Sequence, residues 1–302
     1  MDNNNNIKFE KLVFEENDQN ALKFFVKNGY VHYKNLFPKD LINRSSEFVL
    51  SSFLKLKKIS EGGEFPNDFQ GWGNAVLEKF TKTNDYKLII ENSKSINILK
   101  KYLGNDLAIL NYDHLWINLP ENKDPVLKKA THTDVWTGTS INTILANIYF
   151  TDVDEYNGLT VFPGSHLQGL MPVRNRAPDP LYNVEYQPVN LSNLEKGDFI
   201  FWHPLLLHST TGNSNKNIRI SMSMRFTSTE TEFTSQEKTL GYKTLSVSPM
   251  NQITRIIGND YLTPFRTYGG YAGVEKRLKK LYDLVEQKSD LNIDYEKYID
   301  EN

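Results

Sequence analysis

Two side chains that can bind a metal stand two residues apart near the middle of the chain. The stretch Thr131-His132-Thr133-Asp134 offers an imidazole and a carboxylate, and His208 offers a second imidazole far downstream. Side chains at positions i and i+2 of an extended segment point to the same side, so His132 and Asp134 can bind one ion together. Two histidines and one carboxylate form the facial triad of non-haem iron(II) oxygenases, which leaves coordination positions open for dioxygen and a co-substrate.

An arginine near the distal histidine extends this group. In the segment 204–226, the turn-forming residues 212–215 separate two apolar runs, which predicts a β-hairpin with His208 opposite Arg219, within about 5 Å. A guanidinium on a partly buried face needs an anion. A dicarboxylate bound to the metal by one end would present its other carboxylate to Arg219. Thr210 shares the strand face of His208 and can offer a hydroxyl to the same carboxylate.

Other residues of these types have simpler interpretations. A lone His-X-Asp pair occurs by chance in many proteins, so the interpretation depends on the triad and Arg219 together. Arg225 is expected to form an ordinary salt bridge and Trp202 to lie in the core, whereas Trp136, just after the metal motif, is the candidate for the substrate pocket. The remaining histidines that we expect to be structural are His32, His114, His166 and His203.

The elements that must position these residues are short strands. Between residues 107 and 226 the sequence breaks into short apolar or alternating runs separated by Gly, Pro, Asn and Asp, which is typical of a jelly roll or barrel. The expected fold is therefore mainly β with flanking helices. The predicted strands cover residues 108–112, 115–118, 143–151, 159–162, 198–201, 205–209 and 218–226.

The regions around this β core are predicted to be helices and loops. Helical periodicity over 18–57 and 93–103 makes residues 1–106 a mainly helical part, interrupted by an edge strand at 29–33. Glycines and Trp72 predict a pocket-bordering loop over 61–74, and 168–190 is expected to be a lid or substrate loop. The C-terminal extension, residues 227–302, contains an amphipathic helix at 273–286 and an acidic tail.

Composition narrows the class of protein. The 302 residues are expected to form one domain with a sizeable core. The net charge is −2 and the basic residues are scattered, which argues against nucleic acid or a membrane as partner and favours a small-molecule substrate. The chain has no cysteine, so any metal is held by histidine and carboxylate. No window has the apolar length of a membrane span, which favours a cytoplasmic location, and the oligomeric state stays open.

The motifs resemble those of the phytanoyl-CoA dioxygenase family of iron(II)/2-oxoglutarate oxygenases. The resemblance covers residues from about 20 to 230, in matching order and spacing, and implies a double-stranded β-helix, the jelly-roll fold also called cupin-like. The family's metal positions fall on His132, Asp134 and His208, and its 2-oxoglutarate arginine falls on Arg219. Thr210 and Asn147 fall where the family contacts the co-substrate. The matching stretches are 25–37, 131–134, 157–166, 196–208 and 218–221.

The resemblance implies a reaction in which 2-oxoglutarate and O2 give succinate and CO2 while a small molecule is hydroxylated at an Fe(II) site. Related halogenases lack the carboxylate ligand, so Asp134 predicts hydroxylation or another oxidation and not chlorination. A zinc or manganese site with the same ligands is an alternative that leaves Arg219 unexplained. A non-catalytic jelly-roll protein that binds a sugar or another small molecule leaves the triad unexplained. The family name does not identify the substrate.

Overall fold

The computed structural model describes residues 12–61, 69–120, 131–155, 157–174, 177–178, 186–210, 213 and 217–256. They fall into two compact units, Met1–Ser246 and Val247–Asn302, and each is considered by itself. In the second unit the described element is the helix α7 (Pro249–Ile256). The predicted helix at 273–286 and the predicted acidic tail lie outside the described residues. The predicted domain boundaries therefore stay predictions.

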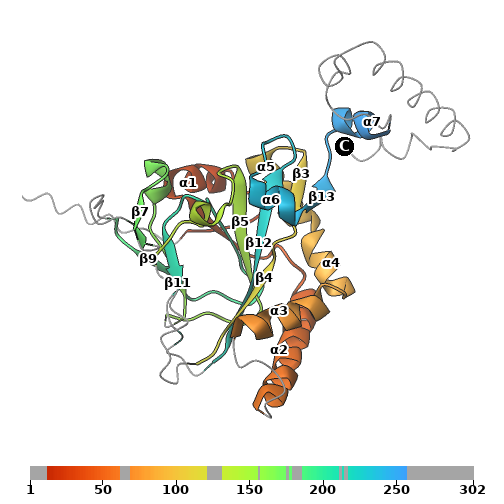
Figure 1. The fold of residues 1–302 in the computed structure, drawn as a ribbon, viewed down its shortest axis with the longest axis vertical. Coiled ribbons are helices and arrows are strands. Elements are labelled where there is room, and N and C mark those ends of the chain that lie inside the picture. Colours follow the sequence, from red (N-terminus) through yellow and green to blue (C-terminus); the bar gives the residue numbers. More distant parts are fainter. Residues whose placement is uncertain are drawn as a thin grey trace, which may run out of the picture. The chain divides into compact units, whose positions relative to one another are not determined.

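The first unit is built on two facing sheets, the predicted mainly β architecture (Figure 1). The large sheet has the order β1-β2-β10-β5-β12-β3-β13, with β4 also pairing with β12, and the small sheet has the order β11-β6-β9. Every pair is antiparallel except β1 with β2. The strands of the large sheet are β1 (Val13–Phe14), β2 (Tyr30–Tyr33), β3 (Leu107–Leu110), β4 (His114–Asn118), β5 (Thr143–Tyr149), β10 (Phe199–Trp202), β12 (Arg219–Ser228) and β13 (Tyr242–Ser246). Those of the small sheet are β6 (Leu159–Val161), β9 (Val189–Leu191) and β11 (His208–Thr210).

Helices cover the outer face of the large sheet. Along β12 the outward side chains Ile220, Met222 and Met224 are buried in one hydrophobic cluster with Phe53 and Ile98 from the helices. Burying such a side chain contributes about 1.5–3 kcal/mol, so this layer fixes which face of β12 turns inward. The helices of this unit are α1 (Asn20–Asn28), α2 (Lys39–Glu61), α3 (Phe69–Phe80), α4 (Asn84–Ile90), α5 (Ser93–Leu103) and α6 (Ser235–Leu240). None of the described helices combines the length and apolar composition that crossing a membrane requires.

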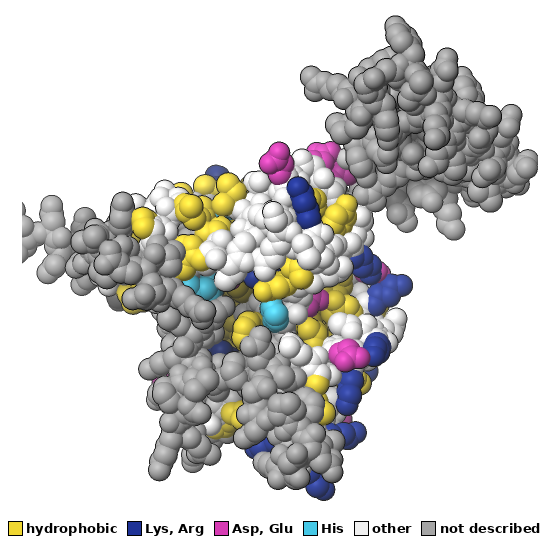
Figure 2. Space-filling view, viewed as in Figure 1, with side chains coloured by type: hydrophobic (Ala, Val, Ile, Leu, Met, Phe, Trp, Pro, Cys, Tyr) yellow, Lys and Arg dark blue, Asp and Glu magenta, His cyan; other side chains and the backbone are white. Residues whose placement is uncertain are grey.

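The types of side chain at the surface of this unit differ between the middle of one face and its edge. Hydrophobic and histidine side chains reach the surface in the middle of the face shown in Figure 2, whereas most of the visible lysine and arginine side chains lie along one edge. In the same view of the ribbon, the middle of this face lies between β11 on one side and β12 and β4 on the other. The described surface in the middle of this face is therefore mainly uncharged.

The predicted loop over 61–74 is wrong in its second half, where α3 begins at Phe69. A Cβ atom at Gly73 would lie 2.1 Å from the carbonyl oxygen of Leu115, so this glycine lets the helix pack directly on β4. Trp72 is buried in the core against Phe53, with ring centroids 5.5 Å apart. The glycines here serve close packing as well as chain reversal.

Two strand predictions also need correction. The strand at 29–33 is not at the edge of the sheet, because β1 pairs with β2 on its outer side. The predicted hairpin over 204–226 is wrong, because β11 pairs with β6 in the small sheet whereas β12 pairs with β4 and β5 in the large one. Asn213 is fully buried, and its Nδ2 donates to the carbonyls of Asn118 at 2.9 Å and Asn217 at 2.7 Å. It anchors a crossing between the sheets and does not sit at an exposed turn.

The predicted lid over 168–190 is described only in part. It contains a short antiparallel pair, β7 (Val173–Arg174) with β8 (Ala177–Pro178), and it leads into β9. The other residues of this segment between 175 and 185 lie outside the described residues. Its role as a substrate loop stays a prediction.

Candidate active site

The two histidines of the predicted triad are joined through their backbones. His132 and His208 form an antiparallel bridge in which each N–H donates to the other's carbonyl at 3.0 Å. Thr133 is extended, with φ −117° and ψ 151°, and Asp134 opens the short 3-10 helix η2 (Asp134–Thr137). The backbone N–H of Asp134 donates to Pro204 at 2.9 Å. As expected for an extended segment, His132 and Asp134 point the same way.

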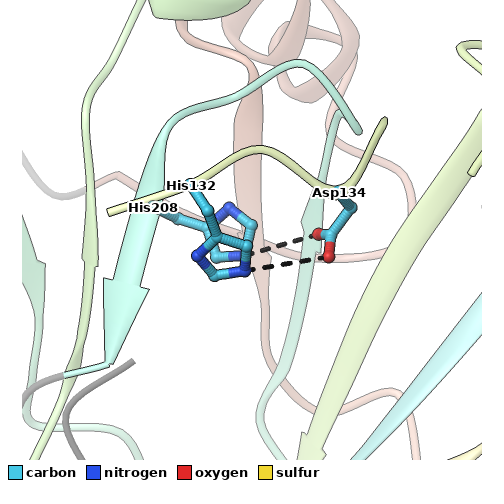
Figure 3. A group of neighbouring side chains, drawn as sticks. All are labelled: His132, Asp134 and His208. Atoms are coloured by element: carbon cyan, nitrogen blue, oxygen red, sulfur yellow. Dashed lines mark ion pairs between the residues drawn. The ribbon is translucent and has the colours of Figure 1, made fainter. Parts of the chain in front are cut away.

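The three side chains converge on one buried point (Figure 3). Nε2 of His208 lies 3.3 Å from Oδ2 of Asp134, and Nε2 of His132 lies 3.9 Å from Oδ1. The imidazole centroids are 4.3 Å apart, and one donor atom from each residue lies within 4.8 Å of the others. Two imidazole nitrogens and a carboxylate oxygen at this spacing fit a divalent transition metal, which favours N and O ligands together.

Neighbouring groups fix the orientation of these side chains. Nδ1 of His208 donates to the carbonyl of Leu206 at 3.0 Å, which leaves Nε2 with the lone pair that faces Asp134. The indole Nε1 of Trp202 donates to Oδ2 of Asp134 at 3.1 Å. Trp202 is buried, as predicted, but it also holds the carboxylate, a role that the sequence analysis missed. Such outer contacts orient metal ligands and tune their affinity.

The strand register defines what lines the interior of the large sheet. Arg225 pairs with Leu145, which in turn pairs with Trp202, so these three form one rung beside Asp134. The next inward rung along β12 joins Ser223 to Asn147. The inward row of β12 is Arg219, Ser221, Ser223, Arg225 and Thr227. Two cationic side chains in this row are thus separated by two small polar ones.

Arg219 is a buried cation with backbone partners. It is 3 % exposed, and its Nη1 donates to the carbonyls of Asn157 and, at 3.2 Å, Gly158. Among the described residues, its Nε has no hydrogen-bond partner and no carboxylate oxygen lies within 4.0 Å of its nitrogens. Burial lowers the pKa of Arg219, and the nearby phenol of Tyr149 acts in the opposite direction. Such a group is costly unless an anion joins it, so the residues present fit a dicarboxylate co-substrate.

Thr210 and Asn147 are the two other residues predicted to contact the co-substrate. Thr210 pairs with Leu159 on β6, next to the Gly158 carbonyl that accepts from Arg219. Asn147 is buried, and its Oδ1 has no hydrogen-bond partner among the described residues. A Cβ atom at Gly158 would lie 2.6 Å from the backbone carbonyl oxygen of Leu191, so a larger residue would force the chain to shift here.

Trp136, predicted to border the substrate, lies in η2 immediately beyond Asp134. It is half-buried, and its indole Nε1 is buried without a hydrogen-bond partner among the described residues. An indole with an unused donor beside the His–Asp–His cluster is a suitable contact for a polar group of a ligand. Its role in substrate binding stays a prediction.

The remaining histidines divide into two groups. His32 contacts Asp198 at 2.8 Å, and Nε2 of His166 donates to a backbone carbonyl at 3.0 Å, so both have structural partners. Burial lowers the pKa of His203 to about 4, with the charge of His166 acting in the same direction. His114 differs, because it lies on the inward side of β4, paired with Ser223.

The expectation of an ordinary salt bridge for Arg225 is wrong. Its guanidinium carbon lies 3.9 Å from the centre of the Tyr112 ring, and no carboxylate of the described residues lies within 4.0 Å of its nitrogens. Only 7 % of the residue is exposed. Because Arg225 pairs with Leu145 of β5, its side chain turns inward toward the His–Asp–His cluster. The sequence pattern alone does not reveal this position.

Comparison with known proteins assigns the family. Residues 25–221 of this chain match the family Phytanoyl-CoA dioxygenase (PhyH). The chain belongs to the phytanoyl-CoA dioxygenase family. A Caenorhabditis elegans protein described as a probable phytanoyl-CoA dioxygenase is 23% identical over 228 residues, which cover 68% of this chain and 73% of the relative.

Solved structures with a similar fold agree with this membership. The apo form of the non-haem monooxygenase ThoJ is similar with a TM-score of 0.56 and 15% identity, over 88% of this chain and 98% of that one. The hydroxyectoine complex of EctD from S. alaskensis, which also contains 2-oxoglutarate, has a TM-score of 0.54 and 14% identity, over 72% and 79%. The epimerase SnoN with Fe3+ and alpha-ketoglutarate has a TM-score of 0.52 and 18% identity, over 69% and 82%.

Membership of the phytanoyl-CoA dioxygenase family confirms the predicted class of enzyme, an iron(II)- and 2-oxoglutarate-dependent oxygenase of jelly-roll fold. It supports this prediction over the alternative of a non-catalytic binding protein, for which a buried His–Asp–His cluster has no use.

Proposed function

We propose that this member of the phytanoyl-CoA dioxygenase family hydroxylates a small molecule at an Fe(II) site formed by His132, Asp134 and His208. The proposal assigns the distal carboxylate of 2-oxoglutarate to Arg219. The observation that supports it most directly is the combination of a buried His–Asp–His cluster with a buried guanidinium that has no carboxylate partner among the described residues. The His–Asp–His cluster is suited to a metal ion, and the buried guanidinium needs an anion to offset its charge.

The protein's own residues hold the ligand set in place. The Leu206 carbonyl fixes the tautomer of His208, and the Trp202 indole fixes the carboxylate of Asp134. His132, Asp134 and His208 would supply three ligands to an iron ion, which would keep other coordination positions for the co-substrate and dioxygen. When bound there, iron with 2-oxoglutarate and O2 supplies the oxidising power for hydroxylation, with release of succinate and CO2. Asp134 fills the position that would be vacant in a halogenase, which favours oxygen transfer over chlorination.

Arg219 is proposed to anchor the end of 2-oxoglutarate that is remote from the metal. A planar guanidinium can bind a carboxylate through two parallel hydrogen bonds, and its unused Nε is one donor. Thr210 is proposed to add its hydroxyl, since its strand pairing puts it next to the carbonyl that Arg219 contacts. Asn147 is proposed to contact the co-substrate with its buried amide. Trp136 is proposed to contact the substrate.

The test is uncoupled turnover, which requires no known substrate. Protein reconstituted with iron(II) under argon is exposed to oxygen with 2-oxoglutarate, and succinate is measured. We expect succinate from the wild type, loss in His132→Ala, and loss in Arg219→Gln unless 2-oxoglutarate is raised strongly. Arg44→Gln is the control, because Arg44 is an exposed arginine paired with Asp40 and Asp85 on the surface.

Two outcomes would contradict the proposal. Succinate formation that persists in Arg219→Gln at low 2-oxoglutarate would remove Arg219 from the co-substrate site. Turnover supported by zinc or manganese equally well as by iron would restore the alternative metal assignment. A calorimetric titration of 2-oxoglutarate into the metal-loaded, oxygen-free protein separates binding from catalysis in each variant.

The surroundings in which the enzyme acts are also proposals. A small-molecule substrate agrees with the family, and the net charge of −2 supports the expectation that nucleic acid is not a partner. A cytoplasmic location and independence from membranes are proposed on the sequence pattern. Cell fractionation would check both.

A further inference from the structure

A second arginine lines the interior of the site on the side away from the proposed co-substrate. Arg225 lies in the same inward row as Arg219, six residues farther along an extended strand, which is about 20 Å at about 3.3 Å per residue. Its rung contains Trp202, whose indole contacts Asp134. Arg219 instead contacts the carbonyls of Asn157 and Gly158. The two arginines therefore serve opposite ends of the interior.

Arg225 has an aromatic support and no carboxylate partner within 4.0 Å among the described residues. Its guanidinium lies over the ring of Tyr112, at 3.9 Å from the centroid, and the residue is 7 % exposed. Burial lowers the pKa of Arg225, and the charges of Asp134 and Glu237 act against this. A buried guanidinium stacked on one face keeps its edge available for hydrogen bonds.

The two carboxylates whose charges act on Arg225, those of Glu237 and Asp134, form their hydrogen bonds with other groups. Oε1 of Glu237 accepts from the backbone N–H of Ser140 at 2.9 Å and from the hydroxyl of Thr143 at 3.2 Å. Its Oε2 accepts from the backbone N–H of Thr234 at 2.9 Å and closes the capping box of α6. Asp134 contacts Trp202 and faces the histidines. Neither forms an ion pair with Arg225 within 4.0 Å.

The neighbours of Arg225 leave room for a ligand. Ser223 is the next inward residue on β12, and His114 faces it from β4. Ser223, His114 and the next inward residue of β4, Trp116, are partly exposed, although the outward residues between them are buried. Solvent therefore reaches the inner face of the sheet here, beside a small polar side chain and an aromatic wall.

We propose that Arg225 binds a carboxylate of the primary substrate and holds that substrate over the metal cluster, with Tyr112 as its planar support. This inference rests on the proposed function of the same site. A carboxylate fits better than a phosphate, because a single guanidinium that has Asp134 and Glu237 nearby would bind a dianion against the repulsion of both. The substrate class is therefore a small carboxylic acid with an apolar or aromatic body that can rest against Trp116.

The test compares acids with their uncharged amides. The probes are 3-phenylpropanoate, octanoate and the two corresponding primary amides, with phenyl phosphate as the dianion. They are titrated by calorimetry into protein loaded with nickel(II) and 2-oxoglutarate under argon, so no turnover occurs. A charge-assisted hydrogen-bond pair predicts that at least one acid binds about tenfold to a hundredfold more tightly than its amide in the wild type.

Variants separate the charge of Arg225 from its packing. We expect Arg225→Gln to abolish the preference for acids, Arg225→Lys to keep part of it, and Arg44→Gln to leave it unchanged. Affinity for 2-oxoglutarate should stay within about twofold in Arg225→Gln, which also reports that the variant is folded. The carboxylate-binding role thus has its own readout, separate from activity.

Several results would overturn this inference. Equal binding of acids and amides, no binding of either acid by protein that binds 2-oxoglutarate, or an acid preference that persists in Arg225→Gln would each do so. Tighter binding of phenyl phosphate than of both acids would overturn the carboxylate assignment. Failure of the wild type to bind 2-oxoglutarate at all is a different result, because it would contradict the proposed function itself.

Discussion

Replacing Trp202 by phenylalanine should weaken metal binding without leaving a large cavity in the core. The indole Nε1 donates to Oδ2 of Asp134 at 3.1 Å, and the ring packs in a buried cluster with Leu145 and Ile200. Trp202→Phe keeps most of that apolar contact and removes the donor. A hydrogen bond to an ionised carboxylate contributes about 1.5–3 kcal/mol, which corresponds to roughly tenfold to a hundredfold in affinity. Loss of an outer-shell partner of a metal ligand has a similar magnitude.

The assay is an anaerobic calorimetric titration with iron(II), because it reports the ligand set without requiring turnover. Trp72→Phe is the matched control: Trp72 is similarly buried, packs against Phe53, and has no hydrogen-bond partner for its Nε1 among the described residues. Both variants should lose some stability through the smaller ring. Only Trp202→Phe should raise the dissociation constant for iron. If its metal affinity stays within about twofold of the wild type, the indole does not hold the ligand carboxylate, and the reasoning is refuted.

Three other predictions concern packing, pH and the co-substrate. Gly73→Ala should lower the free energy of unfolding by about 1–3 kcal/mol in urea, because its Cβ would lie 2.1 Å from the Leu115 carbonyl oxygen; an unchanged midpoint would contradict this. Burial raises the pKa of Asp113 to about 6, so the folded state binds more protons and wild-type stability should fall as pH rises from about 4 to 6. Asp113→Asn, which can still accept from Tyr86, should therefore be more stable than the wild type at pH 8, by up to roughly 3 kcal/mol, and no more stable near pH 4. Thr210→Val should raise the KM for 2-oxoglutarate about tenfold in the succinate assay and leave iron affinity unchanged, and an unaltered KM would exclude the hydroxyl from the site.

Much of the site could be predicted because its geometry is local. An extended His-X-Asp places two side chains on one side whatever the rest of the fold does, and Thr133 is extended. The alternation along β12 correctly separated the inward Arg219 row from the outward methionines. The helix predicted at 93–103 is α5 (Ser93–Leu103), with Asn92 as its N-cap.

The errors arise where tertiary pairing overrides a local pattern. The run around Asn213 has the composition of a tight turn, but its side chain is used to bridge two backbone carbonyls during a crossing between sheets. Gly73 was interpreted as loop material, although a glycine also allows close approach of a helix to a strand. Trp202 and Arg225 gained their roles from pairing with β5, which no single strand reveals.

The reciprocal backbone bonds between His132 and His208 have a consequence for how the metal is acquired. An ion that joins distant parts of a chain usually loses part of its binding free energy to the entropy of closing the intervening loop. Here two backbone hydrogen bonds of 3.0 Å between His132 and His208 also hold that loop closed. Removal of the metal by a chelator should therefore leave the protein folded, in contrast to small domains that unfold without their ion. For the same reason an alanine at either position removes an imidazole and keeps the bridge.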